Sequence, residues 1–240
     1  MASPPSSPPQ VAQGSASSAT TPSNRNLLSN FELPTIICNG AVILGNVTYG
    51  PGNVFHPQCV IDGRLAPITI GKGNVFEEMC HIVSREATPL AIGSGNYFSV
   101  HSKVDGVKSI GNWNIVSIKG RLVNVERLPS DCFVGIDVDL ARLPPCQVAP
   151  STSFFSISPP DSGTSDTDDR TQVRTVKLHP DITTVNRREN AARVTYLQTV
   201  LPRSHRLNHP VAQSPPVKAP EPAAGGPPGS SSPRSPPAQQ

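Results

Sequence analysis

The sequence predicts an all-β fold: a left-handed parallel β-helix of about six coils, followed by a C-terminal α-helix and flanked by disordered tails rich in proline and serine. Three observations predict it. Large apolar residues recur at every sixth position, similar Gly-x-Gly-Asn stretches return at intervals of roughly one coil, and the prolines cluster towards the two ends. A period of six fits neither a helix of 3.6 residues per turn nor a long alternating strand, but it fits a short strand and a bend, repeated.

The six-residue repeat holds a large apolar residue at each of 17 positions in three runs. Three repeats close a triangular coil of 18 residues, and stacked coils hydrogen-bond as parallel strands about 4.8 Å apart. We therefore expect these side chains to fill one dry interior, with those from Tyr49 to Ile110 forming its central stack. The positions are Ile37, Ile43, Tyr49, Phe55 and Ile61, then Ile70, Phe76 and Ile82, then Ile92, Phe98, Val104, Ile110, Val116, Leu122, Leu128, Val134 and Leu140.

Two insertions interrupt the repeat, at residues 62–69 and 83–91. Counting the faces of the triangle in threes places both insertions at the same corner of successive coils. Each contains a proline, Pro67 and Pro89, which is typical of an exposed loop. We expect two exposed loops, one above the other.

Glycine and asparagine recur together near a second corner. The functional alternative is a phosphate-binding loop, which requires a helix to follow the glycines, and no helical pattern follows here. Glycine and asparagine tolerate the left-handed backbone of tight turns, so we predict corner turns. The residues are Gly50, Gly71, Gly93 and Gly111, and Asn53, Asn74, Asn96 and Asn114.

Three histidines, His56, His81 and His101, are the candidates for catalysis in the repeat region. They occupy three different places in the hexad, whereas a catalytic zinc needs three converging imidazoles. A hexapeptide acyltransferase needs one histidine beside a groove between neighbouring prisms. A γ-type carbonic-anhydrase-like zinc enzyme and an acyltransferase are therefore alternatives, while the prediction is a chain with no catalytic, cofactor-binding or metal-binding residues.

The five cysteines form no Cys-x-x-Cys motif. Cys59 and Cys80 share one inward position in adjacent coils, so they are either a redox pair or, the commoner case, small buried hydrophobic residues. Two pairs of carboxylates, Glu77 with Glu78 and Asp137 with Asp139, are expected to be solvated, because nothing in the sequence places them around a cleft.

Composition divides the chain into five segments. The tails and the linker contain too few large apolar residues to offset the entropy of ordering. The predicted segments are a disordered tail over 1–30, the β-helix over 31–148, an acidic Ser/Pro linker over 149–171, a C-terminal segment over 172–209 whose helix packs on the β-helix, and a second disordered tail over 210–240.

A helix is predicted over residues 184–207. Asn186 followed by Glu189 matches a capping box at its start, and Pro202 should stop or kink it. Its apolar stripe should lie on the flank of the prism. The stripe consists of Val194, Leu197 and Leu201, with Tyr196 and Val200 beside it.

Charge is unevenly distributed. Residues 31–150 carry nine basic and ten acidic side chains, while residues 170–210 carry eight basic and two acidic ones. The basic segment either meets an acidic partner or is a solvated face. The sequence has no signal-peptide pattern and no apolar run long enough to span a bilayer, so we expect a soluble protein in a reducing compartment.

Four stretches resemble the dynactin subunit 6 family of hexapeptide-repeat proteins: Gly40–Ile61, Ile68–Ile82, Ile92–Val107 and Tyr196–Leu207. The Phe-His-Pro element of the first and the Asn-Val-Phe-Glu-Glu element of the second are more specific than the bare hexads. The Tyr-Leu…Leu-Pro…His…Leu pattern of the last is not expected of a generic hexapeptide enzyme. The resemblance covers about 32–145 and 172–209 and is weakest over 121–150.

The resemblance implies a non-catalytic structural subunit of the dynactin complex, in the pointed-end subcomplex, supporting dynein-driven transport of cargo on microtubules. The implied partners are dynactin subunit 5, the pointed-end actin-related protein and the p62-type dynactin subunit, with dynein bound indirectly. It implies no cofactor, no nucleic acid, no membrane insertion, and a place in the cytoplasm and cytoskeleton.

Overall fold

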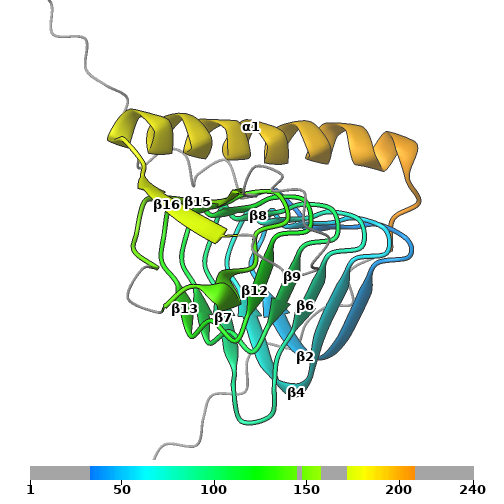
Figure 1. Ribbon diagram of the computed structural model, residues 1–240. Coiled ribbons are helices and arrows are strands. Elements are labelled where there is room, and N and C mark those ends of the chain that lie inside the picture. The colour runs from blue at the N-terminus through cyan, green and yellow to red at the C-terminus, as the bar shows by residue number, and fades with distance from the viewer. Residues whose placement is uncertain (1–32, 145–147, 158–171, 209–240) are drawn as a thin grey trace, which may run out of the picture. The chain divides into compact units, whose positions relative to one another are not determined.

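The computed structural model describes residues 33–144, 148–157 and 172–208. In these ranges the chain winds into a left-handed parallel β-helix with one α-helix, α1 (Pro180–Ser204), along its side (Figure 1). The predicted fold class is confirmed. The predicted disordered tails over 1–30 and 210–240 lie outside the described residues. No helix within the described ranges has the length and apolar character needed to cross a membrane.

The face of the prism under α1, here called face A, is a ladder of parallel strands that ends in one antiparallel strand. The parallel strands are β1 (Ile36–Ile37), β3 (Val54–Phe55), β5 (Val75–Phe76), β8 (Tyr97–Phe98), β11 (Ile115–Val116), β14 (Phe133–Val134) and β15 (Thr152–Ile157), and the antiparallel one is β16 (Gln172–Lys177).

The other two faces form a second sheet. Its first two strands, β2 (Val42–Tyr49) and β4 (Val60–Ile70), run round the corner between faces B and C. Face B continues with β6 (His81–Val83), β9 (Lys103–Asp105) and β12 (Arg121–Val123); face C continues with β7 (Leu90–Ile92), β10 (Ser109–Ile110) and β13 (Arg127–Leu128). A short 3-10 helix, η3 (Leu140–Arg142), follows face B of the last coil.

The strand register aligns the hexad residues of successive coils. On face A, Phe55 pairs with Phe76 and Phe76 with Phe98, and their rings stack nearly parallel with centroids 4.9 and 5.1 Å apart. The predicted central stack lies inside the prism and is at most 3% exposed, except for Tyr49 in the first coil, which is half-buried. Burial of each large side chain stabilises the fold by about 1.5–3 kcal/mol.

The first insertion differs from its prediction. Residues 62–69 were expected to form an exposed loop, but β4 continues through them to Ile70, with a register shift against β2. The Ser84 hydroxyl, at the start of the second insertion, donates to the Ala66 carbonyl (2.6 Å) and accepts from the Ala66 N–H (3.2 Å). The two insertions therefore stack at one corner, and their contacts keep the first one in the sheet.

The predicted linker begins too early. Residues Thr152–Ile157, placed in the linker, form β15, whose Phe154 pairs with Val134 and is completely buried. β16 then pairs antiparallel to β15. Local composition, rich in serine and proline, concealed this strand, whereas Phe154 fills the interior of one further rung on face A.

Helix α1 starts four residues earlier than predicted. His179 caps it, its imidazole accepting from the Asp181 N–H, and Pro180 occupies the first turn, where its missing N–H costs nothing. Asn186 lies inside the helix. Pro202 does not stop the helix, which ends at Ser204. Its 25 residues span about 37 Å, enough to cross the seven parallel rungs of face A, which span about 29 Å.

Candidate functional site

Helix α1 packs against face A through an apolar layer outside the prism. The strands of this face carry a second apolar residue that points outward, next to the inward one. Among these, Val54 and Val75 are at most 1% exposed, and on the helix Val194 and Leu201 are 1% and 4% exposed. Val194 and Leu201 of the expected stripe are thus buried, with Ala191 added and Leu197 partly buried. Tyr196, expected beside the stripe, is 64% exposed instead. The helix and the prism form one packed body over the described residues.

Polar contacts fix the helix at three coils. Gln198 donates to the Gly52 carbonyl (3.2 Å) and Asn190 to the Gly95 carbonyl (3.3 Å). Towards the last coil, Arg187 Nε and Nη2 each lie 2.6 Å from a carboxylate oxygen of Asp131. This bidentate geometry is the strong form of the ion pair, so it sets the position of the helix along the prism.

Replacing Arg187 with alanine is expected to reduce the free energy of unfolding by about 1–3 kcal/mol, because the half-buried Asp131 carboxylate loses its charged donors. Urea unfolding followed by circular dichroism measures this. The control is Arg188→Ala, one residue along, where the side chain is exposed and makes no ion pair within the described residues. Equal effects of the two substitutions would contradict the role given to the Arg187–Asp131 pair.

The residues after α1 return to the first coil. We call residues 205–208 the strap. Leu207 forms an antiparallel bridge with Cys38, the Asn39 N–H donates to the Arg206 carbonyl (2.7 Å), and the Asn208 N–H donates to the Ile37 carbonyl (2.8 Å). The strap therefore covers the otherwise open edge of β1, as β16 covers the edge of β15 at the other end of face A.

His56 lies at this corner, nearly buried, with Nδ1 2.9 Å from Glu78 Oε1. Burial would raise the pKa of Glu78, but the hydrogen bond and charge of His56, together with His205 of the strap, lower it below its ordinary value. His56 Nε2 is buried and has no hydrogen-bond partner within the described residues. His56 therefore acts in the contact between coils and not at an open surface.

The three candidate histidines do not converge. His81 and His101 are exposed on the prism surface, whereas His56 is bound to Glu78. In the described ranges, no group of three His, Cys, Asp or Glu side chains is arranged to hold a metal ion.

The carboxylates expected to be solvated are partly engaged. Glu77 accepts from the Tyr97 hydroxyl, from the Ser99 hydroxyl (3.2 Å) and from the Val100 N–H (3.2 Å). Burial and the bond to Glu77 raise the pKa of Tyr97 to about 12. Asp139 caps η3 by accepting from the Ala141 N–H. The expectation was wrong for Glu77 and Glu78, because stacked coils bring donors to them from neighbouring coils. It was also wrong for Asp139, whose donor lies two residues along its own coil.

The Tyr97 ring also contacts helix α1. The Arg193 guanidinium lies 4.0 Å from its centroid, a cation–π geometry, and Arg193 donates to Asn190 at 2.9 Å. Glu77, Tyr97 and Arg193 thus form one chain of contacts from the prism to α1.

The predicted corner asparagines are buried and form an internal ladder. Asn74 donates to Asn53 Oδ1 through its backbone N–H (2.8 Å) and its side chain (2.9 Å), and Asn96 donates to Asn74 Oδ1 in the same way. Asn114 N–H continues the ladder to Asn96. These asparagines have no positive φ. They serve to satisfy buried backbone donors between coils, not to adopt a left-handed turn.

The predicted corner glycines also differ from the prediction, because they do not adopt the left-handed backbone. Positive φ occurs instead at Gly52, Gly73 and Gly95, and at Trp113 in the next coil. A Cβ added at Gly71 would lie 2.6 Å from the Gly93 carbonyl oxygen. Gly93 stands in the same relation to Gly111, and Gly50 lies next to Gly71 in the same column. At Gly71 and Gly93 the backbones of adjacent coils approach too closely for a Cβ, whereas a Cβ at Gly50 would lie 3.1 Å from its nearest neighbours.

Four cysteines, Cys38, Cys59, Cys80 and Cys132, are free and buried. Burial raises the pKa of Cys38 and Cys132 to about 11 and that of Cys80 well above its ordinary value. Cys59 and Cys80 are completely buried in the interior of the prism, and no disulfide joins them. This arrangement fits small buried hydrophobic residues.

Alkylation tests this arrangement. At pH 8, we expect Cys38 and Cys132 to react with iodoacetamide about 200-fold more slowly in the native protein than after unfolding, since a pKa near 11 leaves few thiolates. Cys59 and Cys80 should also react more slowly in the native protein, because they are completely buried. Mass spectrometry of the peptides measures each rate. A native Cys59–Cys80 disulfide, or equal rates before and after unfolding, would contradict the interpretation.

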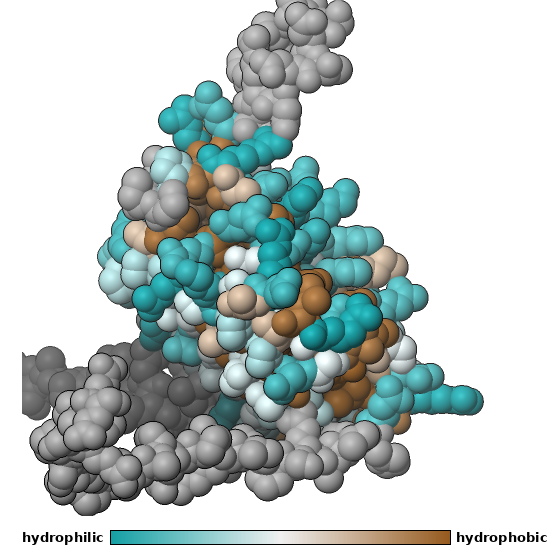
Figure 2. Space-filling model, turned by 90° about the horizontal axis from the view of Figure 1, so that it is seen from below, coloured by the Kyte–Doolittle hydropathy of each residue, from teal (hydrophilic) through white to brown (hydrophobic). Residues whose placement is uncertain are grey.

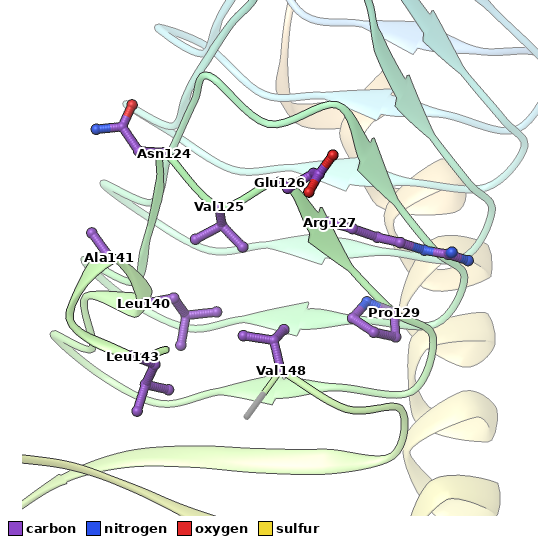
Figure 3. Close-up of a pocket in the computed structure, with 9 residues that line it drawn as sticks. All are labelled: Asn124, Val125, Glu126, Arg127, Pro129, Leu140, Ala141, Leu143 and Val148. Atoms are coloured by element: carbon purple, nitrogen blue, oxygen red, sulfur yellow. The ribbon is translucent and has the colours of Figure 1, made fainter. Parts of the chain in front are cut away.

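A pocket of about 370 Å³ opens at the last coil. Figure 3 shows Val125, Leu140 and Val148 directed towards the same space, while Asn124 and Arg127 point away from it. Glu126 on its margin forms an ion pair with Lys108 (2.9 Å). The described lining contains no histidine, serine or cysteine, and its apolar side chains leave room for an apolar group. Its lining is Asn124, Val125, Glu126, Arg127, Pro129, Leu140, Ala141, Leu143 and Val148.

Of the comparisons with known proteins, the one with solved structures gave a match. No protein-family model matches the sequence, and no curated protein matches it. Among solved structures, the chain is similar to the crystal structure of a Bacillus cereus protein to which acetyltransferase activity has been ascribed. The two share 12% sequence identity with a TM-score of 0.25, over 71% of this chain and 95% of that one.

This comparison corrects one prediction. The sequence led us to expect a chain that is not an enzyme, whereas the matched structure belongs to a protein with an ascribed acetyltransferase activity. The expectation of a non-enzyme is therefore withdrawn. At this identity and TM-score the match assigns no activity and no catalytic residue to the chain.

Proposed function

We propose that the chain is a subunit of the dynactin complex, in the pointed-end subcomplex, where it supports dynein-driven transport of cargo on microtubules. The proposed partners are dynactin subunit 5, the pointed-end actin-related protein and the p62-type dynactin subunit, with dynein reached indirectly. The proposed location is the cytoplasm and cytoskeleton.

One observation carries the proposal: the three most specific stretches of the family resemblance meet at one corner of the prism. His56 of the Phe-His-Pro element contacts Glu78 of the Asn-Val-Phe-Glu-Glu element at 2.9 Å. His205 of the C-terminal stretch acts on the same carboxylate, and Leu207 bridges Cys38. Because these stretches are far apart in the sequence, their meeting supports a shared fold-specific role beyond the general hexapeptide repeat.

The surface of the prism suits an assembly subunit. Face C carries short polar residues outward, such as Thr48, Thr69 and Ser109, along a straight ladder. Figure 2 shows, on the side away from α1, hydrophobic residues in patches among hydrophilic ones. Exposed apolar residues of the first coils include Val42 on β2 and Leu65 on β4 (63% exposed). Rigid stacked faces with open strand edges are surfaces on which other subunits can dock.

Affinity purification tests the proposal. The full chain, tagged at its own locus in its native cells, is expected to co-purify with a second β-helical protein and with actin-related proteins in near-equal amounts. The matched control is the same tag on a chain carrying Val194→Asp, which places a charge under the helix and should reduce recovery of these partners. Recovery of the unmodified chain free of both classes of partner would reject the proposal.

Acetyl transfer is the second candidate, because His81 and His101 are exposed on a hexapeptide prism and a histidine is what that chemistry needs. This candidate predicts that the chain transfers an acetyl group from a coenzyme A thioester. The transfer should be lost on His81→Ala or His101→Ala. Transfer that persists in both variants would reject a role for these histidines.

A further inference from the structure

The first coil of the prism is less well covered than the coils that follow it. Every inward hexad residue from Phe55 to Leu140 is at most 3% exposed. In the first coil, by contrast, Ile37 is 8% exposed, and Ile43 and Tyr49 are only partly buried. These side chains belong to β1 and β2, the blue strands at one end of the prism (Figure 1). The interior of the prism is therefore accessible at this end.

The opposite end of the prism is covered by the chain itself. After the last coil, Leu143 and Val148 pack against the core, and Leu140 of that coil is 1% exposed. Proteins built of stacked repeats need such caps, because a terminal repeat has no neighbour to bury its apolar side. The strap lies along the edge of β1, which is the face A side of the first coil. The inward residues of the other two faces, Ile43 and Tyr49, need a cover of the same kind.

The chain enters the first coil at the rim of this end. The register of β1 with β3 places Thr35 level with Asn53, at the head of the asparagine ladder. The Thr35 hydroxyl donates to the Gly50 carbonyl (3.0 Å), which also accepts from the Asn53 side chain (2.7 Å). Thr35 is thus fixed at the corner between faces C and A, and the residues before it start from that corner.

Pro34 directs the preceding residues away from the path of the coil. In the following coils the residue before the ladder asparagine has a positive φ, as at Gly52, Gly73 and Gly95. This conformation carries the chain round the corner from face C to face A. Because proline fixes φ near −65°, Pro34 cannot adopt it. The residues before Pro34 therefore do not continue the prism as a further regular coil.

The large apolar residues of the N-terminal segment are concentrated just before this corner. Leu27, Leu28 and Phe31 lie close together, whereas residues 1–26 hold only two large apolar residues. Along an extended chain, Phe31 reaches up to about 14 Å from Thr35. The opposite walls of a packed interior lie about 10 Å apart. The three apolar side chains can therefore reach across the accessible end of the prism.

We propose that residues 27–31, here called the cap segment, fold across the first coil and cover Ile43 and Tyr49. The length of the segment, its apolar residues and the corner from which it starts all favour this occupant. A second copy stacked end to end is disfavoured, because the joint would have to accommodate the chains that enter both first coils. The inference does not depend on the proposed assembly role, and it closes this end of the prism to partner subunits.

Photo-crosslinking of the full chain tests the inference. Phe31→p-benzoylphenylalanine places a photoreactive group in the cap segment. After irradiation we expect a crosslink within one chain, which mass spectrometry maps to residues 37–49. Val11→p-benzoylphenylalanine is the matched control and should give no crosslink to those residues. A position-31 variant that forms no crosslink to residues 37–49 of its own chain would overturn the inference. A crosslink from position 31 to those residues of a second chain would assign this end to another copy instead.

Hydrogen exchange of backbone amides gives an independent measurement. In a variant that combines Leu27→Ser, Leu28→Ser and Phe31→Ser, the amides of residues 41–49 should exchange at least about tenfold faster, because an uncovered coil opens more readily. Residues 115–123, in the middle of the prism, should keep their rates, and Val11→Ser should change neither set. Circular dichroism checks that the variants are folded. Unchanged exchange of residues 41–49 in the triple variant would reject the cap segment as the cover of the first coil.

Discussion

Replacing Phe76 with alanine is expected to lower the free energy of unfolding by about 3–5 kcal/mol. Phe76 is completely buried, and its ring stacks between those of Phe55 and Phe98 at 4.9 and 5.1 Å. The shortened side chain leaves a cavity that the rigid coils above and below cannot close, because each of them is fixed by its own ladder of hydrogen bonds. Urea or thermal unfolding, followed by far-UV circular dichroism, measures the loss.

The control for this substitution is Leu65→Ala, because Leu65 is a large apolar residue that is 63% exposed on the bend of β4. It should change stability by no more than about 0.5 kcal/mol. A Phe76→Ala protein as stable as the Leu65→Ala protein would show that the phenylalanine stack does not hold the coils together.

Replacing Asn74 with alanine is expected to cost about 2–4 kcal/mol, which is more than its loss of volume alone would predict. The Asn74 side-chain oxygen accepts from both the backbone N–H (2.9 Å) and the side chain (3.0 Å) of Asn96, and these atoms are buried. Without Asn74, both donors lose their acceptor in a place that water cannot reach. The measurement is the same unfolding experiment, combined with hydrogen exchange of the Asn96 amide.

Asn46→Ala is the matched control, since Asn46 is exposed on β2 and no side-chain hydrogen bond of it lies within the described residues. It should leave stability within about 0.5 kcal/mol, and the exchange of the Asn96 amide should accelerate only in the Asn74 variant. Unchanged exchange at Asn96 in that variant would reject the ladder as a structural element.

The helix-covered face was predictable from a signal that sequence reasoning did not use. The strands of face A begin with a pair of large apolar residues, as in Val54-Phe55 and Val75-Phe76, whereas the strands of face C place Thr69 or Ser109 beside the inward residue. A strand with apolar residues on both sides is buried on both sides. The doublets therefore mark face A as the one that a further layer must cover.

Other features of the site carry no local signal. Arg187 and Asp131 are 56 residues apart. The sequence alone does not distinguish Arg187 from the other basic residues of the helix, because the carboxylate opposite it is brought there by the fold. In the same way, Glu77 and Glu78 are adjacent in sequence, but Glu77 hydrogen-bonds to Tyr97 and Glu78 to His56. Consecutive residues at a corner point to different neighbours.

The sequence by itself determined the coil, the three faces and the vertical order of the interior side chains, because a period of six repeats the same local geometry and each residue needs only its own counterpart above and below. Only the tertiary structure showed that the glycines at one corner lie where the backbones of adjacent coils approach closely. It also showed that β15 adds a rung to face A, and that α1 and the strap cover this face. These depend on contacts between segments far apart in the chain, where the fit of two surfaces, and not a local period, sets the free energy.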